Sequence, residues 1–265
     1  MLRTIRFFLS SRKSWTIPYV IFSAIFVILP LLLIVVYAFM DDAGHFTFGN
    51  FTKFFAHPEA INTFVYSIGV AIITTVACIL LGYPAAYILT QTRMKYAQTI
   101  VVLFILPMWV NILIRTLATV ALFDFMDVPL GEGALIFGMV YNFLPFMVLP
   151  IYNVLIKIDS NVLNAARDLG ANPVQTFVKV TFPLSIPGVI SGITMVFVPA
   201  LTTFVISDLL GGGKLLLIGN VIEQSFKQNS NWHVGSGLSL VLMVFIIASM
   251  ALVAKYDKGE GGTAF

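Results

Sequence analysis

Six stretches of mostly apolar residues run through this chain, and each is long enough to cross a bilayer. A bilayer core of about 30 Å requires roughly 20 such residues in a helix. Hydrophobic residues form 59% of the 265 and charged residues only 10%, which leaves too little polar surface for a water-soluble fold. The sequence therefore predicts an all-α integral membrane protein with six transmembrane helices, at approximately Ile17–Phe39, Thr63–Leu89, Thr99–Phe123, Ala134–Ile156, Gly188–Leu210 and Gly235–Ala254.

The first apolar stretch follows four basic residues and could be read as a secretory signal peptide. It is longer than the roughly 7–15 apolar residues of such a peptide, and no A-x-A cleavage site follows it. We expect a retained span. The single cysteine, Cys78, excludes a disulfide within the chain, and the scattered histidines predict no metal site.

Lysine and arginine gather in alternate loops, which sets the expected orientation because these residues collect on the cytoplasmic side. With the N-terminus inside, 11 of the 15 basic residues fall in cytoplasmic segments. The sequence predicts a multi-pass protein with both termini cytoplasmic. Residues 1–16 and 255–265 would be cytoplasmic ends, and residues 17–254 would form one six-helix domain with a long cytoplasmic loop at 157–187.

The spans carry prolines and asparagines in or near their interiors. Proline removes a backbone donor, and in lipid the freed carbonyl must find a partner in protein or water. Kinked spans that also hold Asn111, Asn142 and Asn153 favour a bundle enclosing a polar path. Proline is also simply common in membrane helices, so the pattern favours transport without establishing it.

The loop at 157–187 contains a short amphipathic helix. Asp159 or Ser160 can cap its start, and Gly170 stands where a left-handed residue would end it. A narrow apolar face follows at helical spacing, formed by Val162, Leu163, Ala166 and Leu169. Such a helix could enter a groove on a partner or rest on lipid headgroups, and the pattern alone does not choose between them.

The same loop resembles the EAA loop of permeases from binding-protein-dependent ABC importers, of the form E-A-A-x-x-x-G-x9-I-x-L-P. The chain has Val180-Thr181-Phe182-Pro183 nine residues after the segment Asn164-Ala165-Ala166-Arg167-Asp168-Leu169-Gly170. The departure is Asn164, where the family usually has glutamate. The resemblance implies that Leu163 to Gly170 couple the chain to an ATPase.

Four other stretches, at 81–84, 142–150, 207–212 and 217–222, are similar to the B-type permease subunits of spermidine/putrescine importers. This similarity covers roughly residues 20–255. It implies the fold of a type I ABC importer permease in a bacterial cell membrane, with a second homologous permease, a cytosolic ATPase homodimer and an extracytoplasmic polyamine-binding protein. The ATPase would bind ATP and Mg²⁺. The chain itself would need no cofactor and bind no nucleic acid, and it lacks the G-x-x-x-x-G-K-[ST] phosphate loop of an ATPase.

A polyamine needs carboxylates for its ammonium groups and aromatic faces for cation–π contacts. Trp109 and Asn111 follow Pro107 in the third stretch, and Asp208 lies near the outer end of the fifth. An acid at the edge of a span is a functional candidate, and the resemblance places an aromatic and an acid of this kind near the substrate path. Trp109 could instead face lipid, and Asp208 could be solvated or paired with Arg115.

Tyr37 and Asp124 are weaker candidates for the same path, and Tyr37 could equally belong to an interfacial aromatic belt. A permease for another small solute fits the same loop. An ion-coupled carrier would need coupling groups near mid-membrane, and an intramembrane enzyme would need a nucleophile–base pair or a metal cluster; the six stretches show neither. The leading hypothesis is a non-catalytic polyamine permease.

Overall fold

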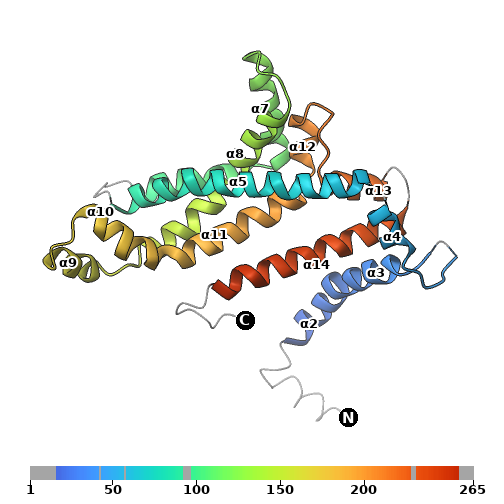
Figure 1. The fold of residues 1–265 in the computed structure, drawn as a ribbon, viewed down its shortest axis with the longest axis horizontal. Helices are drawn as coiled ribbons and strands as arrows, with labels where there is room; N and C mark the ends of the chain where they lie inside the picture. Colours follow the sequence, from blue (N-terminus) through green and yellow to red (C-terminus); the bar gives the residue numbers. More distant parts are fainter. Residues whose placement is uncertain (1–15, 42, 57, 92–96, 228–230, 257–265) are drawn as a thin grey trace, which may run out of the picture. The chain divides into compact units, whose positions relative to one another are not determined.

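The computed structural model describes residues 16–41, 43–56, 58–91, 97–227 and 231–256, so most of both predicted cytoplasmic ends lies outside it. In the described part, helices joined by turns and loops account for the regular structure, together with one isolated β-bridge between Met40 and Phe46. Its long helices confirm the all-α membrane fold: five could each cross a bilayer, and a bent pair makes up a sixth span. Figure 1 labels the helices used below.

In chain order the elements are α2 (Ile17–Ser23), η2 (Ala24–Ile28), α3 (Leu29–Ala38), α4 (Gly49–Ala56), α5 (Pro58–Gln91), α6 (Ala97–Ile105), η3 (Leu106–Trp109), α7 (Ile112–Phe125), α8 (Glu132–Leu155), α9 (Ser160–Asp168), α10 (Pro173–Thr176), η4 (Phe177–Thr181), α11 (Phe182–Thr202), α12 (Val205–Leu210), α13 (Ile218–Lys227) and α14 (Trp232–Tyr256).

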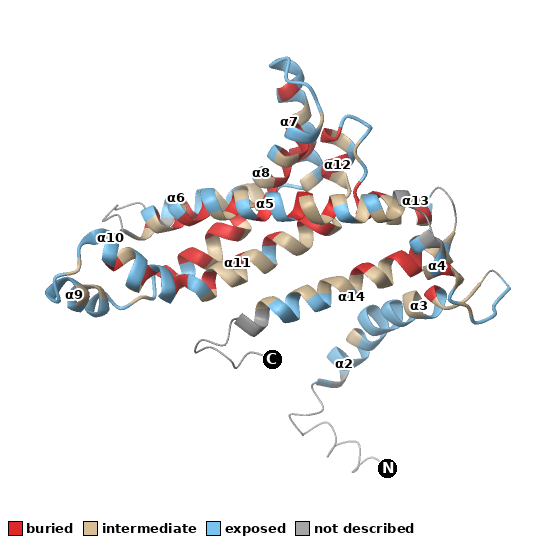
Figure 2. Cartoon of the chain, in the orientation of Figure 1, coloured by how far each residue is buried: buried red, intermediate tan, exposed pale blue. Residues whose placement is uncertain are grey.

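Two compact units make up the chain. Residues 58–223 and 245–265 form the larger unit, and residues 1–57 and 224–244 form the smaller. The core of the larger unit lies where α5, α8 and α11 pack against one another. Its largest fully buried side chains include Leu135, Met139, Met147 and Ile151, all on α8. Figure 2 shows buried residues along these three helices.

Glycines allow α8 and α11 to approach closely. A Cβ added at Gly188 on α11 would lie 2.9 Å from the carbonyl oxygen of Pro150 and 3.1 Å from Cα of Ile151. Those atoms belong to the backbone of α8 and cannot move aside cheaply. Small residues at helix contacts are the usual means of packing helices in lipid, where no hydrophobic effect drives them together.

The third span is broken, which corrects the expectation of one helix at Thr99–Phe123. The half Thr99–Trp109 meets the half Ile112–Phe125 at 96°. Pro107 has no N–H to continue the helix, and Val110 takes an extended conformation with ψ 135°. Asn111 then starts α7, because its side-chain oxygen accepts a hydrogen bond from the Leu113 N–H at 2.8 Å.

The fifth span also ends earlier than the expected Leu210. Helix α11 stops at Thr202, Thr203 is extended with ψ 145°, and α12 begins at Val205. Asp208 therefore lies on a separate short helix. Residues 211–217 return from α12 to α13, whose first turn packs beside this break: a Cβ at Gly219 would lie 2.6 Å from the Thr202 carbonyl oxygen.

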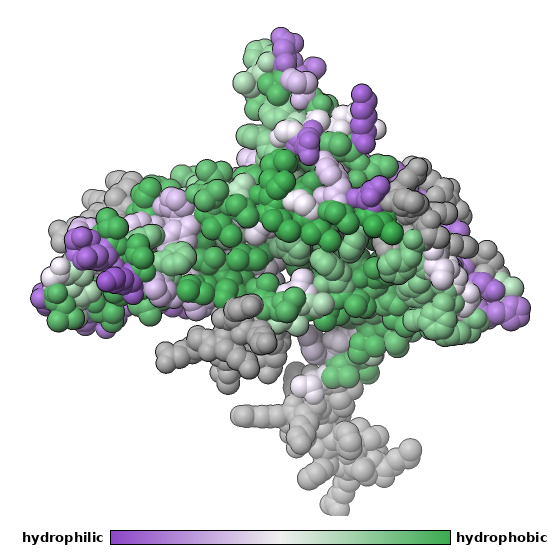
Figure 3. Space-filling model, in the orientation of Figure 1, coloured by the Kyte–Doolittle hydropathy of each residue, from purple (hydrophilic) through white to green (hydrophobic). Residues whose placement is uncertain are grey.

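In the smaller unit, α2, η2 and α3 form a continuous apolar span, Pro18–Ala38. No residue in the most apolar part of this span is buried within the chain. Lipid or another polypeptide must cover such a surface. In the larger unit, hydrophobic side chains cover the middle of α5 and α11, and hydrophilic ones gather around α9 (Figure 3). The distribution is that of helices crossing a membrane.

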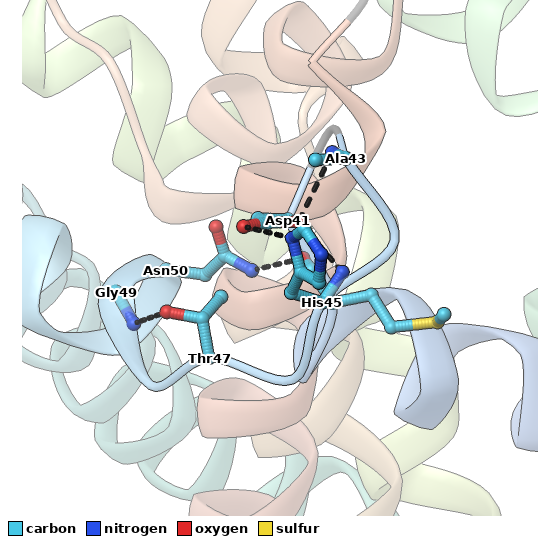
Figure 4. Close-up of polar contacts among 7 residues, drawn as sticks. Asp41, Ala43, His45, Thr47, Gly49 and Asn50 are labelled. Atoms are coloured by element: carbon cyan, nitrogen blue, oxygen red, sulfur yellow. Dashed lines mark hydrogen bonds and ion pairs between the residues drawn. The ribbon is translucent and has the colours of Figure 1, made fainter.

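The turn after α3 is held by side-chain to backbone hydrogen bonds (Figure 4). The Asp41 carboxylate accepts from the N–H groups of His45 at 2.8 Å and Ala43 at 3.0 Å. The His45 N–H bond is the main cause that lowers the pKa of Asp41, so these bonds persist above the usual pKa of aspartate and are lost as pH falls through the lowered value. Asn50 donates to the carbonyls of Ala38 and Met40, which closes the end of α3.

We predict that Gly188→Ala lowers stability because the added methyl meets the α8 backbone. Overpacking of this kind costs about 1–3 kcal/mol. Gly69→Ala in α5 is the matched control: a Cβ there meets nothing within 4 Å, and alanine favours helix by up to about 1 kcal/mol. The midpoint of thermal aggregation in detergent extracts should fall for Gly188→Ala alone; equal midpoints would contradict the close approach.

Candidate functional site

The short helix in the loop at 157–187 has the expected caps. Asp159 is the N-cap, and its Oδ1 accepts from the Asn161 N–H at 2.9 Å. Gly170 has φ +83°, the left-handed conformation in which a side chain would be strained. The Ala171 N–H bonds back to the Ala166 carbonyl at 3.1 Å. The helix α9 is therefore fixed at both ends.

The apolar face of α9 lies open. No residue of α9 is buried, Val162 is exposed, and Leu163 and Ala166 are only half-buried. Leu169, the residue at the C-cap, is 89% exposed. An exposed apolar patch of this kind on a short rigid helix suits a partner's groove or a headgroup layer.

The segment after α9 connects this helix rigidly to the membrane spans. Asn172 and Gln175 form a reciprocal capping box, so α10 begins at a fixed point. The chain then continues through η4 directly into α11. Only the turn at residues 169–172 therefore separates α9 from a continuous helical stretch that leads into α11.

An aromatic cluster joins the same segment to α5. Phe177 of η4 packs edge-on against Tyr83 at 5.9 Å and Tyr87 at 5.0 Å between ring centroids. Phe182 at the start of α11 packs against Tyr83 at 5.6 Å. The Tyr83 hydroxyl hydrogen-bonds the Ser185 hydroxyl at 2.8 Å. These contacts join the end of the loop at 157–187 to α5 and α11.

The first candidate residues lie at the break in the third span. Trp109 is the last residue of η3 and is 86% exposed. Asn111 is exposed, and its Oδ1 caps α7, which gives it a structural role at this break. The structure therefore brings Trp109 and Asn111 together at one bend, with Trp109 free of the chain's own core.

Arg115, on the first turn of α7, stabilises this bend through a hydrogen bond to the residue where the helix breaks. It is only 8% exposed, its Nη1 donates to the Pro107 carbonyl at 2.9 Å, and its guanidinium lies 5.7 Å from the centre of the Tyr141 ring. Among the described residues no ion pair joins it to Asp208. An open cavity of about 660 Å³ lies beside it, with mostly apolar walls from α6, η3, α7 and α8.

Asp208 lies at the other break, on α12, which packs against α7 and α8. Its side chain is exposed, and its Oδ1 accepts a short hydrogen bond from the side-chain amide of Asn220. Ile206, Ser207 and Leu210 are the buried residues of α12. The carboxylate thus stands on the open side of a helix whose other side is packed.

The remaining candidates lie apart from these breaks. Asp124 is exposed near the end of α7 and lines a second cavity of about 410 Å³ with Leu117, Val120 and residues 128–130. Tyr37 belongs to the smaller unit, where its ring packs 5.4 Å from His233 and 6.5 Å from Trp232. In the part of the chain that is described, no group of His, Cys, Asp and Glu could hold a metal ion.

Sequence reasoning did not select Asn220, which contacts Asp208 and the break beside it. An asparagine within the apolar segment Leu217 to Ile222 was the available signal. That signal did not identify the residue that Asn220 contacts, because Asp208 lies 12 residues away across a loop.

Several apolar spans, a sharp bend with an exposed aromatic, an exposed acid beyond the fifth span and a short capped helix in a loop define the class: a multi-span membrane permease. Residues 78–259 match the family described as binding-protein-dependent transport system inner membrane component, and the chain belongs to that family. Among its relatives are the spermidine/putrescine transport system permease proteins PotB of Haemophilus influenzae, 38% identical over 88% of this chain and 89% of that one, and of Escherichia coli K12, 39% identical over 86% and 91%.

Solved structures agree on the fold. A bacterial ABC transporter involved in import of the acidic polysaccharide alginate matches with a TM-score of 0.72 at 15% identity, covering 93% of this chain and 94% of that one. An inward-facing form of the MetNI methionine ABC transporter matches with a TM-score of 0.62 at 17% identity, covering 75% and 94%. The resemblance noted in the sequence is thereby confirmed, and so is the expected type I ABC importer permease fold.

We predict that a cysteine at position 109 reacts with a charged, membrane-impermeant thiol reagent, since thiolates form in water and not in lipid. The background is Cys78→Ala, which removes the one native thiol. Leu80→Cys, at a position 68% exposed in the middle of α5, is the control that should stay unlabelled. If position 109 stayed unlabelled like position 80, Trp109 would face lipid.

Proposed function

We propose that this chain is the transmembrane permease subunit of an ATP-driven importer of polyamines such as spermidine and putrescine. It forms half of the translocation path in a bacterial inner membrane, with both termini cytoplasmic. The six-helix domain at 17–254 carries the path, with residues 1–16 and 255–265 as cytoplasmic ends. The high identity to PotB proteins over most of the chain supports this cargo.

The observation that carries the proposal is the exposed carboxylate of Asp208, six residues beyond the end of the span Pro173–Thr202 and on the short helix α12. A carboxylate in such a place is expensive unless it binds something, and an ammonium group is its natural ligand. Trp109 supplies an exposed aromatic face for cation–π contact. Asn111, Asp124 and Tyr37 are further proposed contacts along the path.

The remaining subunits follow from the same proposal. A second homologous permease completes the path, and an extracytoplasmic binding protein delivers the polyamine. A cytosolic ATPase homodimer binds ATP and Mg²⁺ and receives the open apolar face of α9. Residues Leu163 to Gly170 form the coupling contact, so closure of the ATPases moves α9 and, through η4, α11. The importer would then alternate between inward- and outward-facing states.

We expect Asp208→Asn to lower spermidine uptake about tenfold or more, since a hydrogen bond to a charged group contributes roughly 1.5–3 kcal/mol. Trp109→Ala should lower it about twofold to thirtyfold, for a cation–π contact of about 0.5–2 kcal/mol. Uptake is measured in cells that carry the partner subunits, normalised to the amount of assembled complex. Asp127→Asn, the same change in an exposed turn residue with φ 53°, is the control.

Unchanged uptake in both test variants would remove these residues from the path. A permease for another small solute is the alternative. It would be favoured if the wild-type complex transported that solute and not spermidine, and if the same variants lowered uptake of that solute. Uptake by proteoliposomes that follows an ion gradient and ignores internal ATP would instead indicate a secondary carrier.

We also expect Leu169→Glu to weaken binding of the ATPase about tenfold or more, because it places a charge where an apolar side chain should be buried. Asn164→Glu adds the same charge on another side of α9, at the position where the family usually has glutamate, and should keep the ATPase bound. Co-purification of the ATPase with the permease measures both. Equal binding by the two variants would favour a headgroup role for α9.

A further inference from the structure

Asn220 uses its whole hydrogen-bonding capacity beside Asp208. The residue lies in the first turn of α13 and is 0% exposed. Its Oδ1 accepts from the Ser207 hydroxyl at 2.6 Å and the Leu217 N–H at 2.9 Å. Its Nδ2 donates to the Phe204 carbonyl at 3.2 Å and to Asp208 Oδ1. An amide side chain offers two donors and two lone pairs, and all four are engaged.

These bonds hold the break between α11 and α12 closed. The Phe204 carbonyl belongs to the residue just before α12, and the Leu217 N–H to the residue just before α13. Ser67 of α5 anchors the same turn, because its hydroxyl accepts from the Ile218 N–H at 2.8 Å. Gly219 lets the turn lie directly against the Thr202 and Thr203 carbonyls. The buried side of the break is therefore rigid.

Within the described part of the chain, Asp208 joins this network through its Oδ1 alone. Its Oδ1 receives the Asn220 amide, while the side chain as a whole is exposed. A carboxylate fixed in this way loses little rotamer freedom when it binds a ligand, and such preorganisation strengthens binding. Oδ2 is left to meet a cation on the open side.

We infer that Asn220 is a positioning residue for the transported cation: it orients the Asp208 carboxylate toward an ammonium group in the path. The inference rests on the proposed function, because it assigns a ligand to Asp208. It adds a residue that never touches the cargo and that acts on transport through Asp208. Asn220 is at the same time a structural residue, so the test must separate its two roles.

The pair offers a swap that does so. Asn220→Asp keeps the acceptor for Ser207 and Leu217 but replaces the donor to Asp208 with a second carboxylate. Combining it with Asp208→Asn restores one amide and one carboxylate, with the hydrogen bond running in the opposite direction. The charge then lies at position 220, which is buried. The swap thus repairs the contact and misplaces the carboxylate.

The experiment measures spermidine uptake per assembled complex and the thermal midpoint of the purified complex for Asp208→Asn, Asn220→Asp and the double variant. We expect about a tenfold or greater loss of uptake in each single variant. The double variant should have uptake no lower than Asp208→Asn and a midpoint closer to wild type than Asn220→Asp. Non-additive losses indicate that two residues act as one unit.

A buried asparagine elsewhere supplies the matched control. Asn50 is 3% exposed and donates to two backbone carbonyls, so Asn50→Asp should lower the midpoint and leave uptake per complex unchanged. Three results would overturn the inference alone: normal uptake per complex in Asn220→Asp, wild-type uptake in the swap, or a double variant whose loss is the product of the single losses. Normal uptake in Asp208→Asn would overturn both the inference and the assignment of Asp208.

Discussion

Backbone hydrogen bonding in a medium without water governs the shape of this protein. Inside a bilayer each unpaired N–H or C=O is expensive, so a helix can break only where other groups of the protein replace its bonds. At the third span Asn111 caps the new helix, and Arg115 donates to the Pro107 carbonyl. At the fifth, Asn220 and Ser67 serve the same purpose. The breaks are fixed features of the fold.

The polar side chains that stabilise a break also determine which neighbouring side chains are exposed there. The bend at Pro107 leaves Trp109 exposed, and the break after Thr202 leaves Asp208 on an open helix side. In a continuous helix, the direction of each of these side chains would depend only on its position around the helix axis. The same groups that satisfy the backbone therefore create the surfaces proposed here for a cationic cargo.

Close packing connects these surfaces to the loop at 157–187. Gly188 brings α11 against α8, and the aromatic cluster around Tyr83 and Phe177 joins α5 to the segment that follows α9. Cores packed this tightly move as rigid bodies and not by continuous deformation. Motion of α9 would accordingly be transmitted along α11, whose C-terminal end leads through Thr203 and Phe204 to the helix that carries Asp208.

The sequence by itself determined the membrane class, the approximate spans, the capped helix at Asp159 and Gly170, and the permease family. Each depends on local signals: apolar length, helix-capping residues, or a motif of fixed spacing. Only the tertiary structure decided that the third span is broken, that the fifth ends at Thr202, and that Asn220, not Arg115, contacts Asp208. A break in lipid depends on which distant side chains can satisfy the freed backbone groups, and pairings of that kind leave no periodic trace in the chain.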